Sequence, residues 1–126
     1  VISSESKSIS REATFERDLH VREDREILSD IFTGLCTRVA EDLQRKGYVG
    51  RTIGIKLRYE NFQTITRDLT VRNPTADASI IRKAARDCLR RVPLEQKLRL
   101  LGVRISGLSR ISTLLKENYS FQEELF

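Results

Sequence analysis

Alternating apolar and polar side chains mark residues 51–59 as a strand with two unlike faces. One face of this strand is apolar: Ile53, Ile55, Leu57 and Tyr59. The other face carries a hydroxyl, a glycine and two cations: Thr52, Gly54, Lys56 and Arg58. The apolar face must be buried. The polar face suits a phosphate backbone, because its glycine admits the close approach of a large partner.

The same reading along the chain predicts two helices and three further strands. In residues 21–46 apolar side chains recur at intervals of three and four, and Gly47 follows Arg45 and Lys46 as a left-handed stop. Thr75 is expected to cap the second helix, which Pro93 ends. The further strands are predicted at residues 7–15, 62–71 and 98–108. Asn73 and Pro74 are expected to end the strand at 62–71.

The order strand, helix, strand, strand, helix, strand predicts an α+β fold. We expect a four-stranded, mostly antiparallel sheet with both helices packed on one face, because each strand has only one apolar side. Arg11 and Arg67 share the parity of the apolar residues in their strands. Twist, a bulge or an edge position is expected to bring Arg11 out, and an irregularity is expected near Arg67. The predicted divisions are a linker (1–6), a folded domain (7–110) and a flexible tail (111–126).

Composition narrows the class of protein. A chain of 126 residues with 39% hydrophobic side chains suits one domain. It has no long apolar run and no signal-peptide pattern at its start, so we expect a cytoplasmic protein without a membrane partner. Cys36 and Cys88 fall at apolar helix positions and His20 is the single histidine, so buried thiols are expected and neither a metal site nor a disulfide.

Charge is distributed unevenly. The net charge is +5, and residues 51–110 carry 14 basic and 5 acidic side chains. Such asymmetry points to a polyanionic partner, although an ordinary solvated surface would give the same count.

Three stretches, at residues 7–15, 53–70 and 99–108, carry a resemblance to a known domain. They contain Lys7-Ser8-Ile9-Ser10-Arg11 with Thr14-Phe15, Asn61-Phe62 with Thr66-Arg67, and Arg99-Leu100-Leu101-Gly102-Val103-Arg104 with Leu108. Together they resemble the little finger, or polymerase-associated, domain of Y-family DNA polymerases. The similar branch is DinB (DNA polymerase IV), whose members are error-prone translesion enzymes.

The resemblance implies a domain that grips primer-template duplex DNA through its phosphates, beside the remaining polymerase domains. Matched positions place phosphate contacts on Ser8, Ser10, Arg11, Thr66 and Arg67. The outward side of the predicted sheet adds Lys56, Arg58, Arg104 and Ser106. The resemblance also implies that the catalytic carboxylates and their Mg²⁺ ions belong to a palm domain, so no catalytic residue, metal ligand or cofactor is expected in this chain.

The chain ends in Gln122-Glu123-Glu124-Leu125-Phe126. This resembles the Gln-x-x-Leu-Phe peptide with which bacterial polymerases dock on the β sliding clamp, and it implies clamp contacts by Gln122, Leu125 and Phe126. Alternatively, the apolar residues of the tail pack on the body as a short amphipathic segment.

Two other functions remain open. An RNA-binding module would want aromatic side chains outward on its central strands, whereas the strand at 51–59 presents Thr52, Gly54, Lys56 and Arg58 there. A ferredoxin-like regulatory module with no polymerase role would need a pocket with convergent polar groups.

Overall fold

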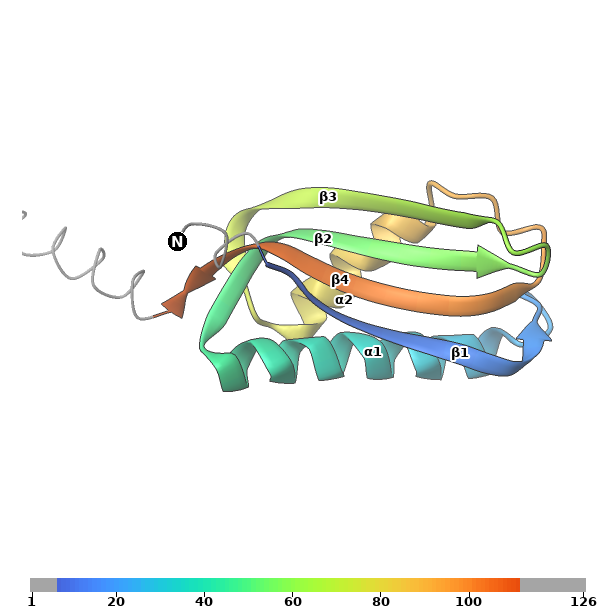
Figure 1. The fold of residues 1–126 in the computed structure, drawn as a ribbon, viewed down its shortest axis with the longest axis horizontal. Helices are drawn as coiled ribbons and strands as arrows, with labels where there is room; N and C mark the ends of the chain where they lie inside the picture. The colour runs from blue at the N-terminus through green and yellow to red at the C-terminus, as the bar shows by residue number, and fades with distance from the viewer. Residues whose placement is uncertain (1–6, 112–126) are drawn as a thin grey trace, which may run out of the picture.

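The computed structural model describes residues 7–111 and has the elements in the predicted order (Figure 1). The elements are β1 (Ile9–Leu19), α1 (Arg25–Lys46), β2 (Tyr48–Tyr59), β3 (Thr64–Thr75), α2 (Ala78–Leu89) and β4 (Leu98–Arg110). The predicted α+β fold is confirmed. The predicted linker at 1–6 and the clamp-binding residues of the tail lie outside the described residues.

The four strands form one sheet in the order β1-β4-β2-β3, and every neighbouring pair is antiparallel. The register aligns apolar residues across the sheet: Ile105 of β4 stands between Ile9 of β1 and Ile53 of β2, and Ile53 stands opposite Leu69 of β3. Side chains directly opposite one another lie on the same face. One face of the sheet is therefore apolar across its two central strands, with Arg11 and Arg67 on the same face at the edge strands.

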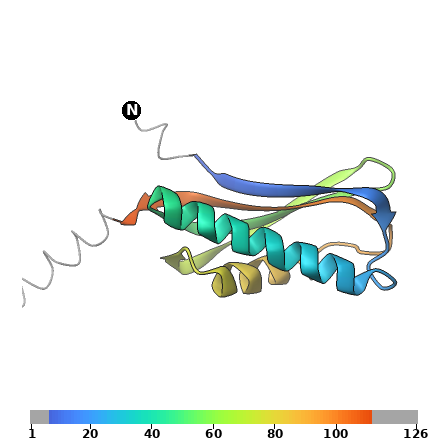
Figure 2. The ribbon, with the colours of Figure 1, turned by 90° about the horizontal axis from the view of Figure 1, so that it is seen from below.

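Both helices cover this apolar face (Figure 2). The long side chains of α1, α2 and the two central strands fill the space between the layers. The most deeply buried of them are Val39, Leu43, Ile53, Ile55, Leu57, Ile81, Val103 and Ile105. Burying each Leu or Ile side chain stabilises the fold by about 1.5–3 kcal/mol. Cys36 and Cys88 are buried free thiols in the same layer, as predicted.

Neither α1 nor α2, the helices of residues 7–111, covers the opposite side of the sheet, and we call that side the open face (Figure 2). Its residues alternate with the core residues along each strand. They are Ser8, Ser10, Glu12 and Thr14; Thr52, Gly54, Lys56 and Arg58; Thr64, Thr66, Asp68 and Thr70; Leu100, Gly102, Arg104 and Ser106.

The left-handed stop of α1 is confirmed, since Gly47 has φ 76° and ends the helix directly after Lys46. At the following hairpin the prediction was wrong by two residues. Phe62 has φ 69° and belongs to the turn, where Asn61 Oδ1 accepts a hydrogen bond of 3.0 Å from the backbone N–H of Gln63. This asparagine turn delays the start of β3 to Thr64.

Three expectations about β3 and the start of α2 were also wrong. The strand continues through Pro74. β3 is an edge strand, so one of its sides pairs with no other strand, and a residue without an N–H is tolerated there. Thr75 is its last residue, and the cap of α2 is instead Asp77, whose carboxylate accepts from the backbone N–H of Ser79 and Ile80. The pairing runs without a break past Arg67, and the irregularity lies further along, beyond the Thr52–Thr70 pair.

A three-residue ion cluster fastens the edge strand β1 to α1. Arg11 donates from Nε and Nη2 to the two carboxylate oxygens of Asp42, at 2.7 and 3.0 Å, and Arg45 Nη2 donates to the same carboxylate at 2.9 Å. Asp42 is 6% exposed, so these bonds compensate a nearly buried charge. The hydrogen bond from Arg11 lowers the pKa of the Asp42 carboxyl below its ordinary value.

Replacing this charge should destabilise the domain in a pH-dependent way. Because the folded-state pKa of Asp42 is lowered, its stabilisation is complete above the unfolded pKa of about 4 and is lost as the pH falls below it. We expect Asp42→Asn to lower the midpoint of thermal unfolding by several degrees at neutral pH, and the deficit to shrink below about pH 4. Glu41→Gln, an exposed neighbour on α1, is the control and should change little. A pH-independent deficit would contradict the assignment.

Candidate nucleic-acid interface

Two rows of residues cross the centre of the open face. In one row, Arg104 of β4 stands between Ser10 of β1 and Gly54 of β2, and Gly54 stands opposite Asp68 of β3. In the other, Gly102 stands between Glu12 and Lys56, and Lys56 stands opposite Thr66. A shallow hollow of about 470 Å³ lies over these rows, and we call it the central hollow. It is lined by Ser8, Ser10, Glu12, Gly54, Ile55, Lys56, Thr66, Arg67, Asp68, Gly102, Val103 and Arg104.

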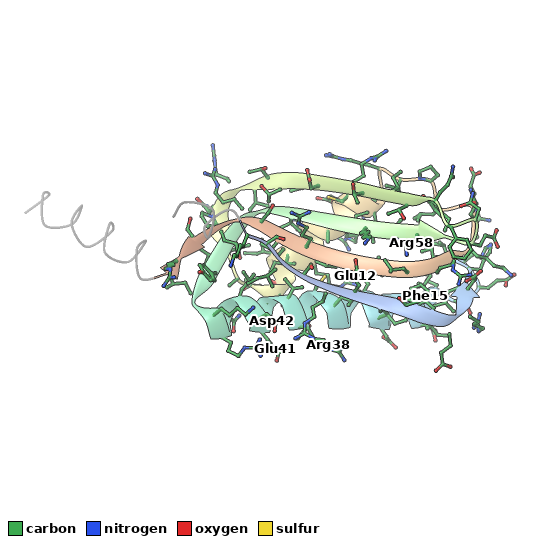
Figure 3. The ribbon with its side chains drawn as sticks, in the orientation of Figure 1. Glu12, Phe15, Arg38, Glu41, Asp42 and Arg58 are labelled. Carbon is green, nitrogen blue, oxygen red and sulfur yellow. The ribbon has the colours of Figure 1, made fainter. Side chains whose placement is uncertain are left out.

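The central hollow brings together most of the predicted DNA-binding positions. Ser8, Ser10, Lys56, Thr66, Arg67 and Arg104 all line it. Arg58 and Ser106 share the open face but do not line the hollow, and Arg58 is held near the β2–β3 hairpin, where its Nε donates to Thr64 Oγ1 at 3.0 Å. Figure 3 shows Arg58 along the sheet from Glu12 and away from the labelled residues of α1.

Arg11 and Arg67 do not have their side chains on the open face. Arg11 stands opposite Val103 and Arg67 opposite Ile55, so both leave the sheet on the helix-covered side. Both remain exposed because they lie on edge strands. The Arg11 guanidinium is bound to Asp42, and Arg67 Nη1 donates 2.7 Å to the backbone carbonyl of Thr66. The expectation that all nine predicted positions form one surface is thus wrong for these two arginine side chains.

The floor of the central hollow contains two glycines of the central strands. A Cβ atom on Gly54 would lie 3.0 Å from the Cβ of Asp68, and one on Gly102 would lie 3.2 Å from Cγ of Glu12. Side chains from the edge strands therefore lean over both glycines. The glycine positions keep the middle of the sheet low enough for a ligand to approach the backbone.

The open face is close to electrically balanced. Its cations are Lys56, Arg58 and Arg104, but it also carries Glu12 and Asp68. Glu12 Oε2 and Lys56 Nζ form an ion pair at 2.9 Å. Neither acid was expected there, although Glu12 has the same parity as Ser8 and Ser10 along the strand.

Much of the basic charge predicted to favour a polyanion lies elsewhere. α2 carries an exposed lysine and several arginines on its solvent side, and Arg82 Nε donates to Thr33 Oγ1 of α1 at 2.9 Å. At the hairpin end of the sheet, Arg99 lies over the exposed ring of Phe62 at 4.4 Å and within 3.5 Å of Asp18. The charge count alone was thus a weak guide to the location of a binding surface.

Within residues 7–111, no group of three or more His, Cys, Asp or Glu side chains is arranged to hold a metal ion. In the same range no helix has the length and apolar character needed to cross a membrane.

Known protein structures share this fold. The complex of the beta-clamp processivity factor with the little finger domain of PolIV contains a similar domain, with a TM-score of 0.63 and 20% identity over 79% of this chain and 87% of that chain. The Dbh ternary complex gives a TM-score of 0.67 and 12% identity over 80% of this chain and 29% of that chain. At these identities the structures establish the fold alone.

Sequence comparison is more specific. The chain is 40% identical over 105 residues to DNA polymerase IV of Streptomyces coelicolor, covering 83% of this chain and 21% of that protein. It is 41% identical over 102 residues to DNA polymerase IV of Methanoculleus marisnigri, covering 81% and 28%. The chain thus spans less than a third of these relatives. Residues 6–118 match the impB/mucB/samB family C-terminal domain. The chain therefore belongs to this family, and it is the little finger domain of a Y-family, DNA polymerase IV-like protein.

Proposed function

We propose that this domain binds primer-template duplex DNA through phosphates lying along the open face. The observation that carries the proposal is the central hollow, in which Lys56 and Arg104 converge with the hydroxyls of Ser8, Ser10 and Thr66 on a sheet surface left free of helices. Ammonium, guanidinium and hydroxyl groups are donors that match phosphate oxygens. Contacts of this kind hold a duplex in place without reading its bases, as a polymerase working on damaged DNA requires.

The parent protein, in this proposal, is an error-prone translesion DNA polymerase of the cytoplasm. Its relatives are DNA polymerase IV proteins, of which this chain corresponds to less than a third. Nucleotidyl transfer needs carboxylates that hold Mg²⁺ beside the triphosphate. We assign the Mg²⁺ ions and the catalysis to a palm domain elsewhere in the parent protein, because this chain matches only a C-terminal domain of the family.

The alternative functions have less support. An RNA-binding sheet would present aromatic rings on its central strands, whereas β2 and β4 present Gly54, Gly102, Lys56 and Arg104. A regulatory module would need an enclosed ligand cavity between the helices and the sheet, and the central hollow lies on the other side of the sheet. The hollow between α1, α2 and the sheet measures only about 180 Å³, below the usual range of about 300–1,000 Å³ for ligand sites.

The DNA proposal predicts a salt-dependent interaction that depends on the open face. We expect Lys56→Gln and Arg104→Gln each to weaken binding to a short duplex several-fold, equally for unrelated sequences, since the contacts are to phosphates. Each should also reduce the slope of log K against log salt by about 1. Fluorescence anisotropy with a labelled duplex over a NaCl series measures both quantities.

The matched control for these variants is Lys83→Gln, which removes one exposed cation from α2 on the helix-covered side. It changes the net charge as much as Lys56→Gln does. Equal losses for the two lysine variants would indicate binding to net charge rather than to the open face, and wild-type binding that is insensitive to salt would refute phosphate recognition altogether.

We further propose that residues 122–126 dock the protein on a bacterial β sliding clamp. The support is the Gln-x-x-Leu-Phe pattern at Gln122, Leu125 and Phe126, together with a fold shared by a little finger domain solved in complex with the beta-clamp processivity factor. Leu and Phe would fill an apolar groove while the glutamine amide forms a hydrogen bond at its edge. Three anchors of this kind suit micromolar affinity, about −8 kcal/mol.

Clamp docking is tested by titrating purified bacterial clamp with the chain, with and without residues 122–126, in a calorimeter. We expect the deletion and Leu125→Ala/Phe126→Ala to abolish measurable binding, because they remove the apolar anchors. Glu123→Ala/Glu124→Ala should retain binding, since those positions are variable in the pattern. Unchanged binding after the deletion would eliminate the docking proposal without affecting the DNA proposal.

A further inference from the structure

Glu12 reaches across a whole strand to hold the central lysine of the open face. It projects from β1, and Lys56 projects from β2, with β4 between the two strands. The carboxylate Oε2 lies 2.9 Å from Lys56 Nζ. Both side chains are solvent-exposed, at 43% for Glu12 and 36% for Lys56.

The glycine at position 102 makes this contact possible. Gly102 is the β4 residue directly between Glu12 and Lys56 in the register. A Cβ at this position would lie 3.2 Å from Glu12 Cγ and 3.6 Å from its Oε2, in the path that the glutamate follows over the strand. The glutamate is thus laid along the floor of the central hollow, at the place where phosphates are proposed to bind.

The Glu12 carboxylate would oppose a phosphate that binds in the central hollow in two ways. It must displace Glu12 from Lys56 before it can take the ammonium group, and it is repelled by the displaced carboxylate, which stays well within the Debye length of about 10 Å at 0.1 M salt. An exposed ion pair is weak enough to exchange. The residues directly opposite Lys56 in the register, Thr66 and Gly102, carry no charge, and the charged Asp68 and Arg104 stand in the next row of the same face.

We propose that Glu12 is an intramolecular competitor of the DNA phosphate for Lys56 and thereby sets the affinity of the open face. The inference rests on the proposed DNA-binding function and adds a residue that opposes it. By exchanging Lys56 between a tethered carboxylate and successive phosphates, the domain holds a duplex loosely enough to shift along it. Glu12 acts on the DNA through Lys56 and is a positioning residue.

The experiment measures duplex affinity of the 126-residue chain at low salt for Glu12→Gln and Glu41→Gln. The two variants remove the same charge, but Glu41 lies on α1 and Glu12 on the sheet (Figure 3). We expect Glu12→Gln to bind the labelled duplex about three- to fivefold more tightly than wild type, the range that an exposed ion pair allows. Glu41→Gln should change the affinity much less, and the advantage of Glu12→Gln should shrink as salt is raised.

A double-mutant cycle with Lys56→Gln separates competition for Lys56 from general repulsion. If Glu12 acts through Lys56, most of the gain from Glu12→Gln disappears in the Lys56→Gln background. A gain of equal size in both backgrounds would overturn the inference. Glu12→Ala provides a second variant, and circular dichroism confirms that each protein is folded.

The outcomes distinguish this inference from the function on which it rests. If no variant binds duplex DNA, the proposed function fails and the inference fails with it. If wild type binds and Lys56→Gln weakens binding, but Glu12→Gln and Glu41→Gln behave alike, DNA binding by the open face stands and the competitive role of Glu12 is refuted.

Discussion

The structure depends on the burial of one face of its two central strands. β2 and β4 alternate apolar and polar residues, and their apolar sides form a continuous surface with Ile53, Leu57 and Val103 at its centre. The described part of the chain provides two helices, and both pack on that side. Because an antiparallel sheet tolerates water on one side, the other face can stay uncovered. A helix on each side would have buried Lys56 and Arg104. The same constraint that forms the core therefore leaves the open face free for the proposed binding of DNA.

Electrostatic interactions act differently on the two sides of the sheet. On the helix-covered side, Arg11 and Arg45 surround the nearly buried carboxylate of Asp42, and this cluster fastens an edge strand to α1. On the open face, Glu12 and Lys56 meet in solvent, where an ion pair contributes little to stability. The Asp42 cluster is structural, because the nearly buried carboxylate has little access to water and would lose its hydrogen bonds if the arginines left. The second pair can exchange partners, which would suit the proposed role of the open face in binding and releasing DNA.

Sequence signals predicted the structure correctly where nearby residues alone fix the backbone. They failed where the position of a neighbouring strand decides the conformation. The end of α1 at Gly47 followed from a glycine able to adopt positive φ after a cationic last turn. The end of β3 did not follow from Pro74, since an edge strand has an unpaired side on which proline is harmless. Thr75 looked like a helix cap but is buried opposite Gly50, and Asp77 took that role. Both of these errors concerned positions whose environment is set by strand order, whereas the late start of β3 came from the local turn at Asn61.

The sequence by itself determined that Lys56 and Arg58 share a face, because alternation along one strand fixes the side of every residue. It likewise determined the fold class and, through resemblance, the family. Only the tertiary structure decided which residues meet across strands. Arg11 binds Asp42 and Glu12 binds Lys56 at separations of 31 and 44 residues. The first pair follows from the packing of α1 against β1, and the second from the placement of β4 between β1 and β2. Strand order and register arise from the packing of the whole core, so they cannot be predicted from a local pattern in the sequence.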